Sequence, residues 1–457
     1  MTLPSVSAKV RLVDSLTRLG QSRIAGPGLA SGMTIIASVL LSFGGQMLIA
    51  RHLGVGSYGQ YAILLSWAML LVLPASLGID GAIMRYMPGY LVRGETRRFR
   101  WLIAVCALAQ VASVLTVIAA LALFNGLGAD IVSWASGYSL IMVGILIGAT
   151  VLGNTGAAVL QAARRVVVAQ LYNNVLRPLL VLLLVAAMLY GVGGGYSAIG
   201  IFSVTAASAV VTTVFVAVYI AAKYLFVASQ GPNDLPVRQW FSYSIANLLG
   251  GVGQQALIQL PLLLVGNYAG TIEASHYGVA SRLAATVLLG LAALASVSMP
   301  LLAAAFDAKD NAEIQKIVTF GARLACGFGL LVATAFALVG VQVLDLFGPG
   351  FRDAYPVLLV LVIGLALSSA LGPAVGVVAI SGRPSVVAGA NVIGVLLVVA
   401  IAAMVVPQHG AMGGAAAFVV GNFVAVLIST VYARVKLGQD TTIIGKSVWG
   451  RAPTVDP

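Results

Sequence analysis

The chain has 457 residues, of which 60% are hydrophobic and 8% are charged, and 25 Lys and Arg against 13 Asp and Glu give a net charge of +12. A soluble domain is about 45–50% apolar and about 25% charged, so this composition excludes a soluble enzyme, a coiled coil and a disordered chain. In a soluble protein the basic excess would indicate nucleic-acid binding, whereas here it predicts how an integral membrane protein is oriented.

Residues Met1 to Pro27 precede the first apolar segment and form a predicted amphipathic N-terminal segment. Val6, Val10, Val13 and Leu16 recur at helical spacing among basic residues. This pattern predicts a helix that lies on the inner leaflet and is held by anionic lipid. A disordered basic tail is the alternative.

Twelve segments are long and apolar enough to cross a membrane as helices, which need about 20 residues. They are Leu29–Ala50, Gln60–Ile79, Trp101–Leu123, Tyr138–Leu160, Leu171–Tyr190, Ile199–Leu225, Tyr243–Gly266, Val279–Phe306, Val318–Val341, Tyr355–Ile380, Val386–Val406 and Met412–Val435. The sequence therefore predicts an all-α polytopic membrane protein.

The Lys and Arg residues divide unequally between the connections of these spans. The odd-numbered connections and the span starts beside them carry only Arg51, Arg282 and Arg352, and the remaining 22 fall to the termini and the even-numbered connections. Because cytoplasmic loops hold the Lys and Arg residues, both termini are expected in the cytoplasm.

The two halves of the chain resemble each other at a nearly constant offset. Tyr58 and Tyr277, Arg164 and Arg383, and Gly191 and Gly410 are each 219 residues apart. Six spans per half give a parallel repeat about an axis along the membrane normal. The repeat predicts two pseudo-symmetric six-helix lobes, an N-lobe at 28–225 and a C-lobe at 241–436, with a cytoplasmic linker at 226–240 and a cytoplasmic tail at 437–457.

Several short motifs carry a family resemblance. They are Ile49-Ala50-Arg51-His52-Leu53-Gly54, Tyr58-Gly59-Gln60-Tyr61, Leu77-Gly78-Ile79-Asp80, Met84-Arg85-Tyr86-Met87-Pro88, Tyr277-Gly278-Val279-Ala280-Ser281-Arg282-Leu283 and Met299-Pro300-Leu301-Leu302. The order and spacing of these motifs resemble those of the polysaccharide-export flippases of the multidrug/oligosaccharidyl-lipid/polysaccharide superfamily. The resemblance extends from about Ser31 to Lys436. The resemblance implies the flippase fold of that superfamily, and transport of an undecaprenyl-pyrophosphate-linked oligosaccharide from the inner to the outer leaflet.

Two arginines match cavity arginines of the related lipid II flippases. Arg51 ends the first span as theirs does, and Ala280-Ser281-Arg282-Leu283 matches the start of their eighth helix. The chain departs from that branch at Tyr58, where the branch has Asp, and at Leu71, where it has Arg, and it lacks the two extra C-terminal helices. Because guanidinium groups bind phosphate bidentately, we expect Arg51 and Arg282 to hold the pyrophosphate. Snorkelling to the outer headgroups is the alternative.

Polar residues on one side of two spans predict a cavity for the glycan. In the seventh span these are Asn247, Gln254, Gln255 and Gln259, and in the first span Gln46 follows Ser38 and Ser42. Hydrogen bonding between helices is an equally good explanation. Pro261 in the seventh span and Pro74 in the second predict bends that serve as hinges for gating.

The acidic residues lie outside the spans or at their ends. Asp80 comes closest to the membrane interior and could pair with Arg85. A cation-coupled multidrug antiporter, the competing function, normally needs a buried carboxylate for its ion. The histidines, His52, His276 and His409, fall in outward connections and are expected to be solvated.

No enzyme, cofactor or metal site is expected, because the chain has no large extramembrane loop, phosphate-binding loop or metal-ligand spacing. The expected partners are the lipid-linked oligosaccharide and membrane lipids, with polysaccharide polymerases or assembly proteins as further candidates and no nucleic acid. The expected location is the bacterial inner (cytoplasmic) membrane.

Overall fold

The computed structural model describes residues 25–126, 137–191, 197–225, 232 and 234–445, and these residues form helices joined by short turns. The helices are α2 (Ala25–Ser76), α3 (Ile79–Val92), α4 (Thr96–Gly126), α5 (Gly137–Ala162), α6 (Val166–Gln170), the π-helix η1 (Leu171–Leu176), α7 (Arg177–Gly191), α8 (Ala198–Ile220), the π-helix η2 (Ala221–Leu225), α9 (Val237–Asp307), α10 (Asn311–Asp345), the 3-10 helix η3 (Phe351–Ala354), α11 (Tyr355–Ser369), α12 (Ala374–Ile380) and α13 (Pro384–Lys436). Residues 1–24 of the predicted amphipathic segment lie outside the described residues.

The prediction of twelve membrane crossings is confirmed. Within the described residues, nine helices are long and apolar enough to span a membrane. Three of these nine hold two crossings each, joined at Gly54 in α2, Gly270 in α9 and Gly410 in α13, where the backbone leaves the helical conformation. In lipid a helix satisfies its own backbone polar groups, so these turns lie where one membrane crossing ends and the next begins.

The internal repeat appears in the backbone itself. Gly54 (φ 69°, ψ 174°) and Gly270 (φ 86°, ψ −177°) adopt nearly the same conformation at the first turn of their lobes. Only glycine adopts this conformation without strain. The matching angles confirm two pseudo-symmetric lobes.

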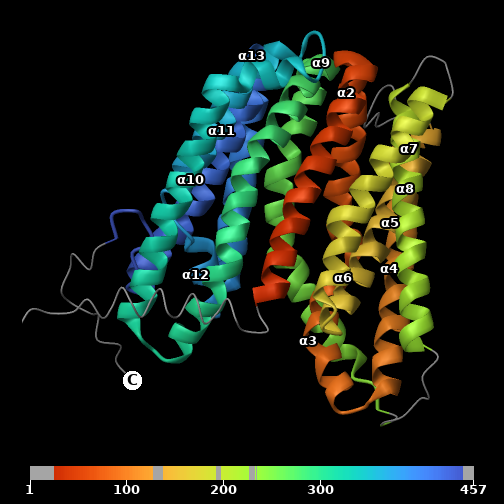
Figure 1. The fold of residues 1–457 in the computed structure, drawn as a ribbon, viewed down its shortest axis with the longest axis vertical. Helices are drawn as coiled ribbons and strands as arrows, with labels where there is room; N and C mark the ends of the chain where they lie inside the picture. Colours follow the sequence, from red (N-terminus) through yellow and green to blue (C-terminus); the bar gives the residue numbers. More distant parts are fainter. Residues whose placement is uncertain (1–24, 127–136, 192–196, 226–231, 233, 446–457) are drawn as a thin grey trace, which may run out of the picture.

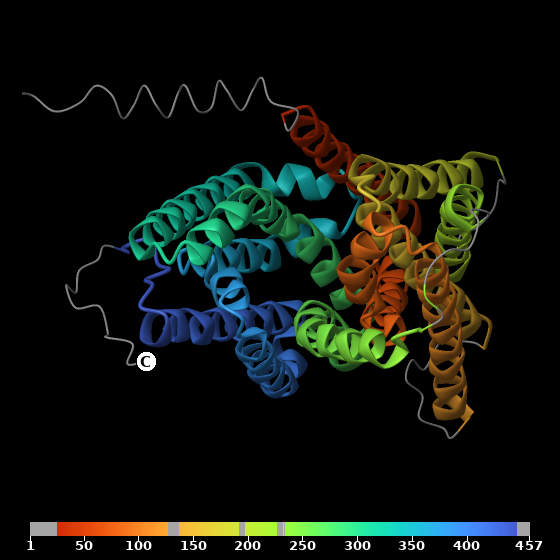
Figure 2. The same ribbon diagram turned by 90° about the horizontal axis from the view of Figure 1, so that it is seen from below.

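The two lobes lie side by side, with α2–α8 in one and most of α9–α13 in the other (Figures 1 and 2). We call the end of the molecule that holds Arg93, Arg98, Lys309 and Lys436 the basic end, and the opposite end, with Gly54, Gly270 and Gly350, the closed end. The first turns of α9 pack on the N-lobe. Trp240, 1% exposed, joins the N-lobe core and donates its indole N–H to the Tyr90 hydroxyl at 3.0 Å.

Two crossings are broken into two helices. The second crossing breaks between α2 and α3 at Leu77 (φ 55°) and Gly78 (φ 66°), and the tenth breaks between α11 and α12 at Gly372 (φ 72°). Part of the predicted C-terminal tail packs against the break between α11 and α12. There the Thr441 hydroxyl donates to the Leu371 carbonyl at 2.8 Å.

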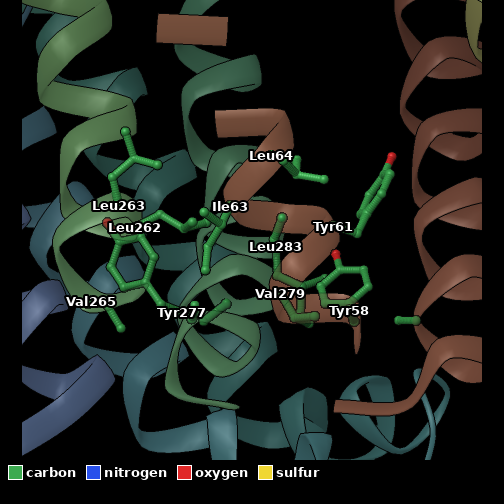
Figure 3. Packing of buried hydrophobic residues seen from close by; sticks show 14 of the residues in the cluster. Tyr58, Tyr61, Ile63, Leu64, Leu262, Leu263, Val265, Tyr277, Val279 and Leu283 are labelled. Carbon is green, nitrogen blue, oxygen red and sulfur yellow. The ribbon is translucent and has the colours of Figure 1, made fainter. Parts of the chain in front are cut away.

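The lobes meet in one continuous hydrophobic core. The second half of α2 supplies Tyr58, Tyr61 and Ile63, and α9 supplies Val279 and Leu283, all buried (Figure 3). This core joins the lobes toward the closed end and fixes the position of the residues that follow Gly270.

Candidate functional site

Arg282 is carried by the second half of α9, where small residues bring the two lobes close together. Gly278 lies one turn before it, and a Cβ atom at Gly278 would lie 3.3 Å from the Ala62 Cβ of α2. Residues four apart share a helix face, so Arg282 also faces α2.

The Arg282 guanidinium is part of a chain of polar contacts across three crossings. Its Nη1 donates to the Tyr58 hydroxyl, and its Cζ lies 5.4 Å from the centre of the Tyr58 ring. The Tyr58 hydroxyl in turn donates to Gln46 Oε1 at 3.2 Å. Tyr58, at the position where the related lipid II flippases have Asp, thus orients Arg282 through both its hydroxyl and its ring.

A cavity of about 280 Å³ adjoins this arginine between α2, α9, α11 and α13. Its polar lining residues are Ser66, Gln259, Tyr277, Ser281 and Arg282, and its other lining residues, Leu65, Met69, Ile258, Leu262, Ala284, Ala285, Leu288, Leu361, Leu365 and Phe418, are apolar. The described part of the lining therefore holds one cation and no carboxylate. Such a cavity suits an anionic group that also carries hydroxyls.

Replacing Tyr58 by phenylalanine removes the hydroxyl between Arg282 and Gln46 and keeps the ring. A hydrogen bond to a charged group is worth about 1.5–3 kcal/mol, so we expect transport to fall by about tenfold or more with little change in protein level. Polysaccharide export by cells carrying Tyr58→Phe measures this. Tyr61→Phe, at a buried neighbouring ring, is the control, and equal export by the two variants would contradict the role of Tyr58.

The four polar residues of the seventh crossing do not act alike. Asn247 Nδ2 donates to the Gly78 carbonyl at 3.2 Å, and Gln255 Nε2 donates to the Met69 carbonyl at 3.1 Å. Gln254 is exposed, and Gln259 lines the cavity. The structure thus brings Gln46 and Gln259 to the arginine, whereas Asn247 and Gln255 join α9 to the backbone of the second crossing.

Alanine substitutions should separate these roles. Asn247→Ala and Gln255→Ala each remove one hydrogen bond between α9 and a backbone carbonyl of the second crossing, which is worth about 0.5–1.5 kcal/mol. We expect a lower apparent melting temperature of the purified protein for both, and an unchanged one for Gln259→Ala, which should instead reduce export. An unchanged melting temperature for Asn247→Ala and Gln255→Ala would show that these contacts do not hold the lobes together.

Arg51 lies at the closed end, away from the cavity lining. It is exposed, and its backbone and side chain lie beside Gly348, with 3.5 Å between the Arg51 Cα and the Cβ position of Gly348. Binding of pyrophosphate by both Arg51 and Arg282 in one site stays a prediction, because in this conformation only Arg282 adjoins the cavity.

Other contacts at the closed end involve backbone carbonyls, and the one made by Ser275 joins the lobes. The Ser275 hydroxyl donates to the Val55 carbonyl. His276 is 6% exposed, and its Nε2 lies 3.0 Å from the Gly350 carbonyl oxygen. The expectation that His276 is solvated was therefore wrong, because the turn before α11 folds over it.

The predicted hinge prolines and the predicted ion pair have different surroundings from those expected. α9 continues through Pro261 to Gly270, and the break after Pro74 lies three residues later, at Leu77. Asp80 accepts a hydrogen bond from Thr155 at 2.8 Å, while Arg85 Cζ lies 5.5 Å from the centre of the Tyr243 ring. The expected pair of Asp80 and Arg85 is thus replaced by contacts with neutral groups.

Arg177 is a charged residue inside a span that the sequence analysis did not single out. Arg177 was counted with the cytoplasmic connections, yet it begins α7 within a crossing of 26 residues. It donates to the Thr150 hydroxyl at 2.8 Å. The sequence already contained the evidence for this, because Arg177 lies inside the predicted span Leu171–Tyr190.

Comparisons with known proteins agree with this architecture. A family model described as "Polysaccharide biosynthesis protein" matches residues 28–306. A search of curated proteins gave no match. Among solved structures, an inward-facing multidrug resistance MATE family transporter of the MOP superfamily is similar at a TM-score of 0.74 and 15% identity, covering 90% of this chain and 98% of that one.

Two further solved structures share the fold. The lipid II flippase MurJ in an inward closed conformation has a TM-score of 0.68 and 14% identity, covering 89% of this chain and 88% of that one. A MOP superfamily transporter from Pyrococcus furiosus, whose structure is described as having a binding pocket of reverse polarity, has a TM-score of 0.60 and 18% identity, covering 89% and 95%. At these identities the likeness establishes the fold alone.

Proposed function

The chain belongs to the polysaccharide biosynthesis protein family, and from this we propose that it is a flippase for undecaprenyl-pyrophosphate-linked oligosaccharide units. It moves each unit from the inner to the outer leaflet of the bacterial cytoplasmic membrane. The basic end faces the cytoplasm, because Lys and Arg concentrate on that side of a membrane protein.

The observation that carries this proposal is the position of Arg282, the one cation among the described residues that line the cavity. Arg282 adjoins a cavity whose described lining includes no carboxylate. An arginine in the membrane costs roughly 2.5–3.5 kcal/mol on insertion scales, and one that faces a cavity without a counter-charge attracts an anion. The pyrophosphate of the substrate supplies that anion, and Gln259 and Ser281 supply donors and acceptors for sugar hydroxyls.

The packing of the lobes supports a cycle that begins with the closed end shut. The Ser275 hydroxyl donates to the Val55 carbonyl across the lobes at the closed end, and in the proposed cycle the cavity loads from the basic end. The lobes then separate at the closed end and release the headgroup, while the polyprenyl tail stays in lipid. An anion that leaves a negative-inside cell gains about 2.3 kcal/mol per charge per 100 mV.

The lining of the cavity also favours this function over the competing one. A cation-coupled exporter of cationic drugs is expected to place a carboxylate against its substrate, whereas the described lining offers a guanidinium. Polysaccharide polymerases and assembly proteins are the partners that this function requires downstream.

The lipid-linked units of a deletion strain test the proposal. We expect a strain that lacks this chain to accumulate undecaprenyl-pyrophosphate-linked repeat units in the inner leaflet, and expression of the chain to clear them. Normal levels of these units, together with increased sensitivity to cationic drugs, would instead support the antiporter.

A further inference from the structure

Two cations of the N-lobe meet on one tyrosine at the basic end. Arg165, the residue before α6, donates through Nη1 to the Tyr219 hydroxyl of α8 at 3.2 Å. The Lys223 Nζ lies 5.9 Å from the centre of the Tyr219 ring. Arg165 and Lys223 are exposed, and Tyr219 is partly exposed. We call these three residues, which join the fifth and sixth crossings, the cationic cluster.

The cationic cluster has no carboxylate partner among the residues that the structure describes. The sequence explains this, because residues 131–233 contain no Asp or Glu. Glu95 and Asp234, at the same end of the molecule, each pair with Arg98 at 3.0 Å. Like charges repel each other, so an anion from outside the chain would stabilise two cations that share one neutral side chain.

The cationic cluster lies where two crossings reach the boundary of the membrane. The fifth membrane-spanning helix is Val166–Gly191, and Arg165 immediately precedes it. The sixth is Ala198–Tyr224, and Lys223 is its last residue but one. Tyrosine is enriched at the level of the lipid headgroups, and long basic side chains extend to that level from helix ends. The cluster is therefore placed to meet headgroups rather than soluble molecules alone.

An apolar stripe on α8 leads from the membrane interior to the cationic cluster. Val211, Val214, Phe215 and Val218 are between 51% and 64% exposed, and their spacing places them on one face of the helix. α8 lies at the outer edge of the N-lobe, so this face meets lipid (Figures 1 and 2). Acyl chains that lie along the stripe bring their phosphate to the cluster.

The donors of the cationic cluster match a phosphate group. Arg165 has five N–H donors and Lys223 has three, and charged donors form strong hydrogen bonds with phosphate. Tyr219 accepts its hydrogen bond from Arg165, so its own O–H is available to donate. A zwitterionic headgroup brings a cation that the cluster repels. The chemistry therefore favours an anionic phospholipid.

We propose that Arg165, Tyr219 and Lys223 bind the phosphate of an anionic phospholipid, whose acyl chains lie along the exposed face of α8. The lipid comes from the leaflet at the basic end and links the fifth crossing to the sixth. Basic pockets between membrane-spanning helices bind anionic headgroups in this way. The site lies on the outside of the N-lobe and does not depend on the proposed function.

Native mass spectrometry of the purified full chain with added phosphatidylglycerol tests the site. Each of Arg165→Gln and Lys223→Gln should weaken the tightest phosphatidylglycerol binding by about fivefold. Tyr219→Phe keeps both charges but removes the hydroxyl, and it should weaken binding by about threefold. Binding of phosphatidylcholine should be weaker and should change little in any of these variants. Equal binding of phosphatidylglycerol by the wild type and all three variants would overturn the proposal.

A charge-matched variant separates this site from general attraction to the basic end. Arg434→Gln with Lys436→Gln removes two exposed cations from the C-lobe and should leave the tightest binding unchanged, unlike Arg165→Gln with Lys223→Gln. Equal losses in the two double variants would overturn the proposal. Displacement of the lipid by an equal concentration of glycerol 3-phosphate would indicate a site for free phosphate instead. Binding of undecaprenyl pyrophosphate but not phosphatidylglycerol would likewise contradict a phospholipid site.

Discussion

Cells that carry Arg282→Ala are expected to lose polysaccharide export, with the transporter still present in the membrane. Loss of the proposed charge pair between Arg282 and the pyrophosphate should cost about 2–5 kcal/mol, which corresponds to a loss of at least about thirtyfold in transport. Among the described residues that line the cavity, Arg282 is the only charged one. Export and the level of lipid-linked repeat units are the two quantities to measure.

Two further variants make the test of Arg282 specific. Arg282→Lys keeps the charge but loses the planar fork and its contact with the Tyr58 ring, so it should restore export only in part. Arg352→Ala removes an exposed arginine of the closed end and should export normally. Normal export by Arg282→Ala at a wild-type protein level would show that the cavity does not bind the anion through this residue.

The second large effect is expected from a single methyl group at the closed end. A Cβ at Gly59 would collide with the backbone carbonyl of Thr271 and lie 3.0 Å from the Ser275 Oγ, so Gly59→Ala forces the lobes apart. Overpacking of this kind costs about 1–3 kcal/mol, and we expect a lower apparent melting temperature and impaired export.

Gly56 provides the matched control for Gly59. It lies three residues earlier in the same helix, and its Cβ position has nothing within 4 Å, so Gly56→Ala should leave both quantities unchanged. A Gly59→Ala protein as stable and active as the Gly56→Ala protein would mean that this contact does not hold the closed end.

The course of the helices could be predicted from sequence because each crossing is a long apolar segment. The twelve predicted spans all fall within crossings of the structure, and the offset between the halves reappears as the equivalent turns at Gly54 and Gly270. Pro74 predicted a bend in the second crossing, but not the position of the break at Leu77 and Gly78. Ser244 and Asn247, more than 160 residues away, approach the chain closely at that position.

The site was predictable only in part. Arg282 could be located because it stands at the start of a span in a motif, but its orientation by Tyr58 depends on contact between the lobes. Helical spacing placed Asn247, Gln254, Gln255 and Gln259 on one side of the seventh span. It could not say which of them meets the backbone of α2 and which meets the cavity, because that depends on the path of the neighbouring helix.

Flipping by the purified protein tests the central claim most directly. The full chain is placed in liposomes that carry an undecaprenyl-pyrophosphate-linked oligosaccharide, and the arrival of the oligosaccharide at the opposite leaflet is followed with a glycan-cleaving enzyme outside. We predict rapid exposure of the glycan with the wild type and a rate near that of empty liposomes with Arg282→Ala. Wild-type liposomes that expose the glycan no faster than empty ones would contradict the account.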